Sequence, residues 1–185
     1  MTDQKKENDT PQCLDEFLES VERRAFKTAL ISTSSQEDAL DIVQDSMMKL
    51  VQKYASKPSI EWPMLFQKIL QSKIRDWYRR QKVRNQWRTF FKPKNDEQED
   101  DLIESAPDLS NTRPDDKFEQ TQAMQTLESA LQKLPLRQRQ AFLLRTWEGM
   151  DVAETAEAMQ CSQGSIKTHY SRAIHTLREI LEDYK

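Results

Sequence analysis

The sequence predicts an all-α protein. Only two glycines occur in 185 residues, and no stretch alternates β-branched and polar residues as a half-buried strand does. Several stretches instead carry apolar residues at helical spacing. Apolar residues make up 36% and charged residues 32% of the chain. We therefore expect two small helical domains, because this polar balance still leaves enough apolar residues for two small cores.

Three helices are expected in the first half. The first covers about 14–31, and the second begins at Ser34, which has capping-box spacing to Glu37. A break at 57–59 precedes a third helix from 62 to about 87. The inward positions are expected at Leu14, Phe17, Leu18, Val21 and Ala25 in the first helix, and at Ala39, Val43, Met47, Leu50, Val51 and Tyr54 in the second.

The third predicted helix becomes strongly basic along its length, and aromatic residues lie among the cations. Lysine and arginine neutralise phosphates, and aromatic rings stack on bases. This combination favours nucleic-acid binding over a merely solvated basic helix. For Trp77 alone, a place in the core and a place in the DNA interface remain equally open.

The charge then changes sign abruptly. Asp and Glu crowd the stretch 93–113, which also contains Pro107, and such a composition is typical of a flexible linker. We therefore divide the chain into a disordered tail (1–12), a first domain (13–92), an acidic linker (93–113) and a second domain (114–185). Pro114 is expected to open a helix, which Pro135 ends, with Phe118, Met124, Leu127, Leu131 and Leu134 facing inward.

The last quarter of the chain has the pattern of a helix-turn-helix. Ser162 is placed to cap the final helix, and its apolar stripe is expected to pack inward. The opposite face offers cations and short hydrogen-bonding groups to a DNA groove. Arg172 on that face can make a bidentate contact with a guanine edge. The stripe comprises Ile166, Tyr170, Ile174, Leu177 and Leu181, and the polar face comprises Ser165, Lys167, Thr168, Ser171 and Arg172.

These features together resemble the extracytoplasmic-function (ECF) group of the sigma-70 family, the bacterial RNA polymerase sigma factors. The resemblance covers nearly the whole chain after residue 12. It rests on Asp41-Ile42-Val43-Gln44-Asp45, on Arg75-Asp76-Trp77-Tyr78-Arg79-Arg80, and on Leu134-Pro135, Arg137-Gln138-Arg139, Glu148-Gly149 and Gly164-Ser165-Ile166-Lys167. The chain departs from the family pattern at Ser72, where asparagine is frequent, and at His169, where arginine is usual.

The resemblance implies three binding surfaces and three partners. The partners are core RNA polymerase (its β and β′ subunits), promoter DNA and an anti-sigma factor. The core-binding surface would comprise Asp41, Gln44, Asp45 and Lys49. The surface for the minus-10 promoter element would comprise Ser72, Arg75, Trp77, Arg79, Arg80 and Arg84. The surface for the minus-35 element would comprise Arg145, Ser165, Lys167, Thr168, Ser171 and Arg172.

Three other classes of protein fit the sequence less well. A LuxR-type regulator has a similar helix-turn-helix, but it usually carries an α/β sensing domain that this sequence does not predict. A helical interaction module would not need the basic and aromatic run. An enzyme is least expected, because His169 and His175 lack a surrounding array of acidic or thiol groups and no phosphate-binding glycine loop occurs. We expect no cofactor, no metal and no catalytic residue. The lack of a signal core and the two distant cysteines favour the cytoplasm.

Overall fold

The computed structural model describes residues 13–90 and 122–182, with side chains at 13–84 and 124–182. Within these ranges every regular element is helical, which confirms the predicted all-α class. The predicted tail (1–12), the acidic linker (93–113) and the positions Pro114 and Phe118 lie outside the described residues.

The elements are α1 (Leu14–Thr33), α2 (Gln36–Tyr54), the 3-10 turn η1 (Ser59–Glu61), α3 (Trp62–Phe90), α4 (Gln122–Lys133), α5 (Leu136–Phe142), the π-helical turn η2 (Leu143–Trp147), α6 (Val152–Met159) and α7 (Gln163–Glu182).

The junction of α1 and α2 differs from the prediction by one residue. Ser34 does not begin α2 but ends α1, with a left-handed φ of 55° and its backbone N–H donating to the Leu30 carbonyl. Ser35 is the cap of α2, and its side chain accepts a hydrogen bond from the Asp38 backbone N–H at 3.3 Å. Either serine can cap a helix, although only Ser34 has the capping-box spacing to a glutamate, and the backbone reversal at Ser34 decides between them.

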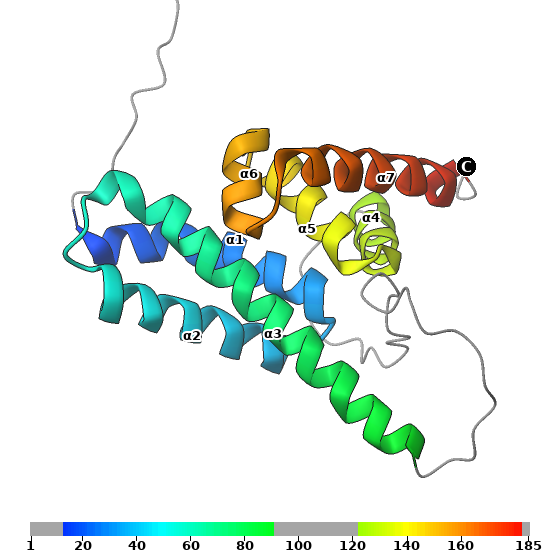
Figure 1. Ribbon diagram of the computed structural model, residues 1–185, viewed down its shortest axis with the longest axis horizontal. Coiled ribbons are helices and arrows are strands. Elements are labelled where there is room, and N and C mark those ends of the chain that lie inside the picture. The colour runs from blue at the N-terminus through cyan, green and yellow to red at the C-terminus, as the bar shows by residue number, and fades with distance from the viewer. Residues whose placement is uncertain (1–12, 91–121, 183–185) are drawn as a thin grey trace, which may run out of the picture.

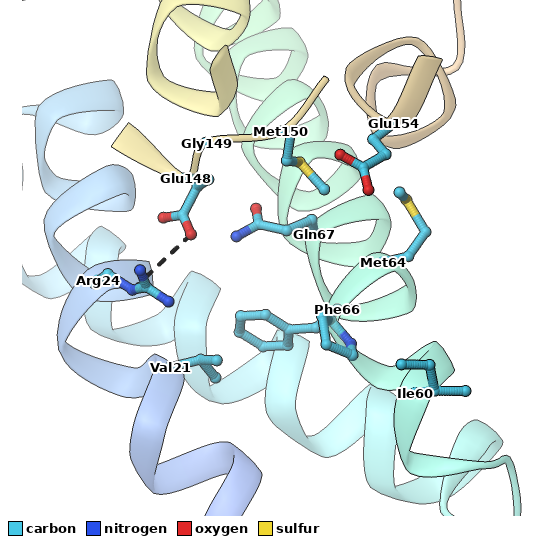
Figure 2. A pocket seen from close by; sticks show the side chains of 11 residues that line it. Val21, Arg24, Ile60, Met64, Phe66, Gln67, Glu148, Gly149, Met150 and Glu154 are labelled. Atoms are coloured by element: carbon cyan, nitrogen blue, oxygen red, sulfur yellow. Dashed lines mark ion pairs between the residues drawn. The ribbon is translucent and has the colours of Figure 1, made fainter. Parts of the chain in front are cut away.

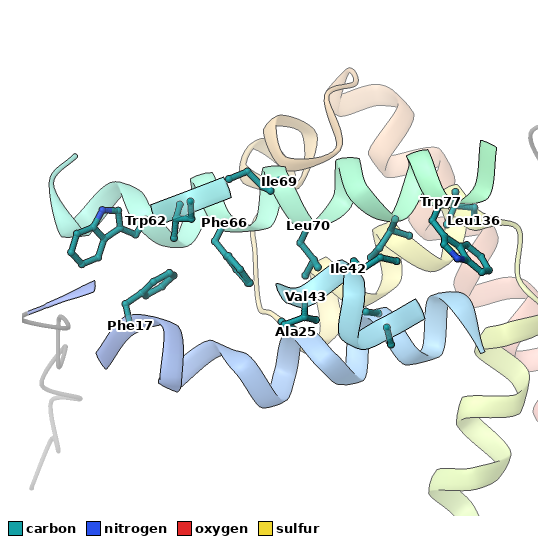
Figure 3. Packing of buried hydrophobic residues seen from close by; sticks show 14 residues of the cluster. Phe17, Ala25, Ile42, Val43, Trp62, Phe66, Ile69, Leu70, Trp77 and Leu136 are labelled. Atoms are coloured by element: carbon teal, nitrogen blue, oxygen red, sulfur yellow. The ribbon is translucent and has the colours of Figure 1, made fainter. Parts of the chain in front are cut away.

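Helices α1, α2 and α3 share one core (Figure 3). Phe17 packs against Trp62 and Phe66, with both pairs of ring centroids 6.0 Å apart. Figure 3 shows Phe17 and Trp62 at one end of this cluster and Trp77 with Leu136 at the other. The predicted inward face of α2 is confirmed at Ala39, Val43 and Leu50, which are buried, and at Met47 and Tyr54, which pack against the cluster. Val51, predicted on that face, is 43% exposed.

Helices α4 to α7 form the second half, and they gather beside the first three helices (Figure 1). Leu131, Leu134, Leu143 and Leu177 are buried between them, and a smaller cluster around Ile166 and Met159 joins α5, α6 and α7.

The two halves are packed together rather than held apart. Ile31 of α1 is buried among side chains of α4, α5 and α7. Conversely, Leu136 of α5 is buried in the core of α1 to α3. Each half therefore completes part of the other half's core, a feature that the sequence did not predict.

The assignment of the two serines is testable, because the two positions respond oppositely. Replacing Ser35 with alanine removes the cap of α2, so the free energy of unfolding should fall by about 0.5–2 kcal/mol. Ser34→Gly should raise it, because glycine adopts the left-handed conformation without the roughly 1 kcal/mol cost borne by other residues. Urea unfolding followed by circular dichroism measures both. If Ser34→Gly destabilised the protein as much as Ser35→Ala, the assignment would be wrong.

Candidate nucleic-acid interface

Helix α2 presents a solvent-exposed ridge that mixes polar and apolar residues. Asp41, Gln44 and Asp45 are exposed, and Lys49 is half-buried. The Asp45 carboxylate is paired with Lys73 Nζ of α3 at 2.8 Å. Three apolar side chains flank the acidic residues on the same helix: Leu40, Met48 and Val51, which are 45%, 57% and 43% exposed. The polar part of this ridge was predicted, but its apolar part was not.

The C-terminal part of α3 carries exposed cations. Arg79, Arg80 and Arg84 are exposed, whereas Ser72 is half-buried. Arg79 pairs with Asp76 one turn earlier at 3.8 Å, and Arg84 donates to Gln81 Oε1 at 2.6 Å. Because exposed pairs of this kind contribute little to stability, these guanidinium groups can exchange their present partners for phosphates.

Trp77 lies in the core and not on the basic surface. Its side chain is 5% exposed and belongs to the cluster of α1 to α3. The ring meets Tyr78 edge to face, with centroids 5.2 Å apart. Stacking of a base on Trp77, which the sequence left open, is incompatible with this conformation, because the neighbouring core residues occupy the space beside the ring.

Arg75 of the same helix is held by the second half of the molecule. Its guanidinium donates to the Met159 carbonyl at 2.9 Å and to Gln160 Oε1 at 3.1 Å. Those two acceptors lie at the C-terminal end of α6, where unpaired carbonyls carry partial negative charge. Burial, and then the nearby Arg137, lower the pKa of Arg75. The predicted minus-10 residues are therefore divided. Three arginines are exposed, Ser72 is half-buried, Trp77 lies in the core, and Arg75 faces α6.

The helix-turn-helix is built from α6 and α7. A capping box opens α6: Asp151 accepts from the Glu154 backbone N–H, and the Glu154 side chain accepts from the Asp151 backbone N–H, both at 2.8 Å. The turn reverses at Gln160, whose φ is 55°. Ser162 then caps α7 by accepting from the Ser165 backbone N–H at 3.1 Å, as predicted.

The outer face of α7 is available to a large partner. Lys167, Thr168, Ser171 and Arg172 are exposed. Ser165 is half-buried and its hydroxyl contacts that of Ser162 at 2.9 Å. On the opposite side Ile166 and Leu177 are buried, while Tyr170, Ile174 and Leu181 pack against the clusters of the second half. The predicted division of this helix into an apolar and a polar face is confirmed.

Arg145 lies in the π-helical turn η2 and is tied to the second half. Its guanidinium donates to the Met150 carbonyl and lies 5.7 Å from the centroid of the Tyr170 ring. These contacts hold the loop before α6 against α7. Arg145 thus lies at the base of the helix-turn-helix, and its side chain remains partly exposed.

The most deeply buried cation of the structure was not predicted as a site residue. Arg139 is 1% exposed. One of its terminal nitrogens donates to the carbonyls of Ile31 and Ser32 and to the Tyr78 hydroxyl, at 3.2, 2.9 and 2.8 Å. The other donates to the carbonyls of Gln132 and Leu134. Burial lowers the pKa of Arg139. The sequence carries one signal for such a residue: Arg139 lies in the polar run 137–140, in which Gln138, Arg139 and Gln140 are buried.

A cavity of about 360 Å³ opens between the two halves (Figure 2). Its walls include Val21, Met64 and Phe66 from the first half and Glu148 from the second. The Glu148 side chain is 8% exposed and lies 4.0 Å from Arg24. Burial raises the pKa of this carboxyl group, while Arg24 lowers it by a smaller amount.

Two kinds of site are not found in the described residues. Between 13 and 90 and between 122 and 182, no group of three His, Cys, Asp or Glu side chains is arranged to hold a metal ion. No helix in the same two ranges combines the length and the apolar character needed to cross a bilayer.

Residues 124–177 match the family model described as "Sigma-70, region 4". The chain is 28% identical over 178 residues to the RNA polymerase sigma factor SigV of Bacillus subtilis, covering 94% of each protein. It is 26% identical to an RNA polymerase sigma-E factor of Streptomyces avermitilis, covering 91% of this chain and 84% of that one. A sigma-E factor of Streptomyces antibioticus is 39% identical over 74 residues, which span only 41% of its length.

A solved structure matches most of the fold. It is the sigma factor RpoE of Bartonella quintana in complex with the anti-sigma factor NepR, with a TM-score of 0.63 and 25% identity, covering 91% of this chain and 96% of that one. The match includes both halves, so it extends well beyond the helix-turn-helix. The all-helical fold, the capped recognition helix and these relatives thus make the chain similar to bacterial RNA polymerase sigma factors, and its residues 124–177 similar to region 4 of the sigma-70 family.

Proposed function

We propose that this chain is a sigma factor that binds core RNA polymerase and directs it to specific promoters. The observation that carries the proposal is the pairing of a capped recognition helix with a helical first half that exposes an acidic and apolar ridge on α2. A LuxR-type regulator would need only the first of these. The sigma-factor relatives, two of which match over most of their length, favour the sigma factor as well.

The proposed division of the chain follows the earlier boundaries. Residues 13–92 would bind core polymerase and the minus-10 element, 93–113 would link the halves, and 114–185 would bind the minus-35 element. The match to region 4 falls inside the last of these. We also propose an anti-sigma factor as a partner, since the Bartonella quintana neighbour was solved with one. Catalysis of nucleotide addition would belong to the polymerase, and the setting would be the cytoplasm.

Run-off transcription tests the whole proposal. Purified chain and core polymerase are incubated with fragmented genomic DNA, and transcripts are sequenced. Discrete start sites should appear only when both proteins are present, since the chain supplies the promoter contacts and core supplies the chemistry. Promoter opening by the chain alone, or no start sites in the mixture, would reject the proposal.

The α2 ridge should be the contact with core. Asp41→Lys places a cation where the ridge is acidic, and a like charge across an interface is costly. We expect the affinity for core to fall by at least about tenfold, measured by biolayer interferometry. Asp45→Lys should add to the loss, although it also breaks the pair with Lys73. Glu22→Lys, an exposed charge reversal on α1, is the matched control. Equal affinities for Asp41→Lys and Glu22→Lys would show that the ridge is only a solvated surface.

The exposed face of α7 should read the minus-35 element. Arg172→Ala should relax base preference at one or two positions, with a loss of about 1–3 kcal/mol of discrimination at each. Lys167→Ala should weaken binding to all sequences alike, as expected for a phosphate contact. Selection of binding sites from a randomised minus-35 library separates the two. An unchanged preference in Arg172→Ala would move base reading to another residue.

A further inference from the structure

The cavity shown in Figure 2 has an apolar side and a polar side. Val21 of α1, Met64 and Phe66 of α3, and Met150 of the loop before α6 supply apolar walls. The volume of about 360 Å³ is within the range of roughly 300–1,000 Å³ that is usual for small-molecule sites. None of the lining residues belongs to the surfaces proposed for core polymerase or promoter DNA. The proposed function therefore leaves this cavity without a role.

Glu148, on the polar side of the cavity, is a buried carboxylate that lacks close partners. Its side chain is 8% exposed, whereas the side chain of Arg24, which is 4.0 Å away, is 56% exposed. Glu148 Oε1 is buried and has no hydrogen-bond donor within the part of the chain that the structure describes. Figure 2 shows the carboxylate directed into the cavity, between Arg24 and Gln67. Because buried carboxylates are normally paired and hydrogen-bonded, Glu148 is short of a donor.

The charges around the cavity indicate which kind of donor fits. Two carboxylates line it, Glu148 and Glu154, against one cation, Arg24. Glu154 is exposed and already accepts from the Asp151 backbone N–H at 2.8 Å, so Glu148 is the group left to be neutralised. Burial raises the pKa of Glu148, and a cation at hydrogen-bonding distance would oppose this effect. A metal ion does not fit, because the described residues hold no group of three ligating side chains.

We propose that this cavity binds a small organic cation, an ammonium group on a compact apolar body. The ammonium group donates to the Glu148 carboxylate, and the apolar body lies against Val21, Met64 and Phe66. A charged donor on a buried carboxylate supplies the specificity, and the apolar walls supply contact area. The inference does not rest on the sigma-factor function, since it uses none of the residues proposed for that function.

Three probes that share one apolar body test the charge of the ligand. Phenethylamine carries an ammonium group, phenethyl alcohol a neutral hydroxyl group and hydrocinnamate a carboxylate. Each is titrated into the full chain, and nuclear magnetic resonance follows isotope-labelled methionine methyl groups. Phenethylamine should shift the Met64 and Met150 signals to saturation, and phenethyl alcohol should bind at least about tenfold more weakly, because a charged donor forms the stronger bond to a carboxylate. Hydrocinnamate should not bind beside Glu148. Met48, exposed on α2, reports non-specific binding.

Two substitutions test where the cation binds. Glu148→Gln keeps the shape of the side chain and removes its charge, so the affinity for phenethylamine should fall at least about tenfold, while that for phenethyl alcohol should stay unchanged. Val21→Phe places a larger ring at the apolar wall and should weaken the binding of both probes. Glu157→Gln is the matched control, because Glu157 is a carboxylate on α6 that does not line the cavity and is 57% exposed. Circular dichroism checks that each variant remains helical.

Four outcomes would overturn the inference. If no probe shifted Met64 and Met150 to saturation, the cavity would hold water only. Equal affinities for phenethylamine and phenethyl alcohol, or tighter binding of hydrocinnamate through Arg24, would show that the site does not select a cation. Equal affinities of Glu148→Gln and Glu157→Gln for phenethylamine would place the cation elsewhere. Shifts at Met48 that match those at Met64 would show non-specific binding. Because none of these measurements involves polymerase or DNA, their failure and that of the sigma-factor function are distinguishable.

Discussion

The arrangement of the two halves depends on one buried guanidinium group. Arg139 joins the C-terminal end of α1 to the C-terminal end of α4 by donating to backbone carbonyls of both. The last carbonyls of a helix have no partner within it and carry partial negative charge. A single cation therefore satisfies two helix ends that belong to different halves. Tyr78 adds a third element, α3, to the same group.

The hydrogen bonds of Arg139 are opposed by the cost of burying its charge. Within the part of the chain that the structure describes, no carboxylate pairs with Arg139, and its Nε has no hydrogen-bond acceptor. A hydrogen bond from a charged donor contributes about 1.5–3 kcal/mol net of the water that it replaces, and three of them cross between the halves. Burial of the charge, which also lowers the pKa of Arg139, opposes this gain. A junction of this composition can therefore specify one orientation of the halves.

The sequence was sufficient for helix α7, whose preferences are local. Helix α7 was predicted with its cap at Ser162 and its two faces, because both depend on residues within a few turns of one another. The cap of α2 was misplaced by one residue, because Ser34 and Ser35 are chemically alike and the choice depends on how α1 ends. Val51 was assigned to the core from its spacing, yet the apolar stripe of α2 is wider than the surface that α1 and α3 cover.

The contacts between distant segments could not be predicted in this way. Trp77 is followed by a tyrosine and two arginines, and whether such a ring faces a base or a core depends on Leu136, which lies 59 positions later and packs in the same cluster. Arg139 fits a solvated basic motif equally well, and it is buried because the ends of α1 and α4 and the Tyr78 side chain surround it. Hydrophobic periodicity reports which face of a helix is covered, but it does not report which helix covers it.

The exposed and the covered surfaces of the first half lie apart. Arg75 and Lys68 of α3 contact α6, whereas the ridge of α2 is exposed to solvent. In the proposed function, a polymerase that binds this ridge would therefore meet no obstacle from the second half. Promoter DNA that reached Arg75 would have to replace its contacts with the Met159 carbonyl and Gln160 Oε1. Both acceptors are neutral, whereas DNA offers a charged phosphate every few ångströms, so this exchange would favour DNA.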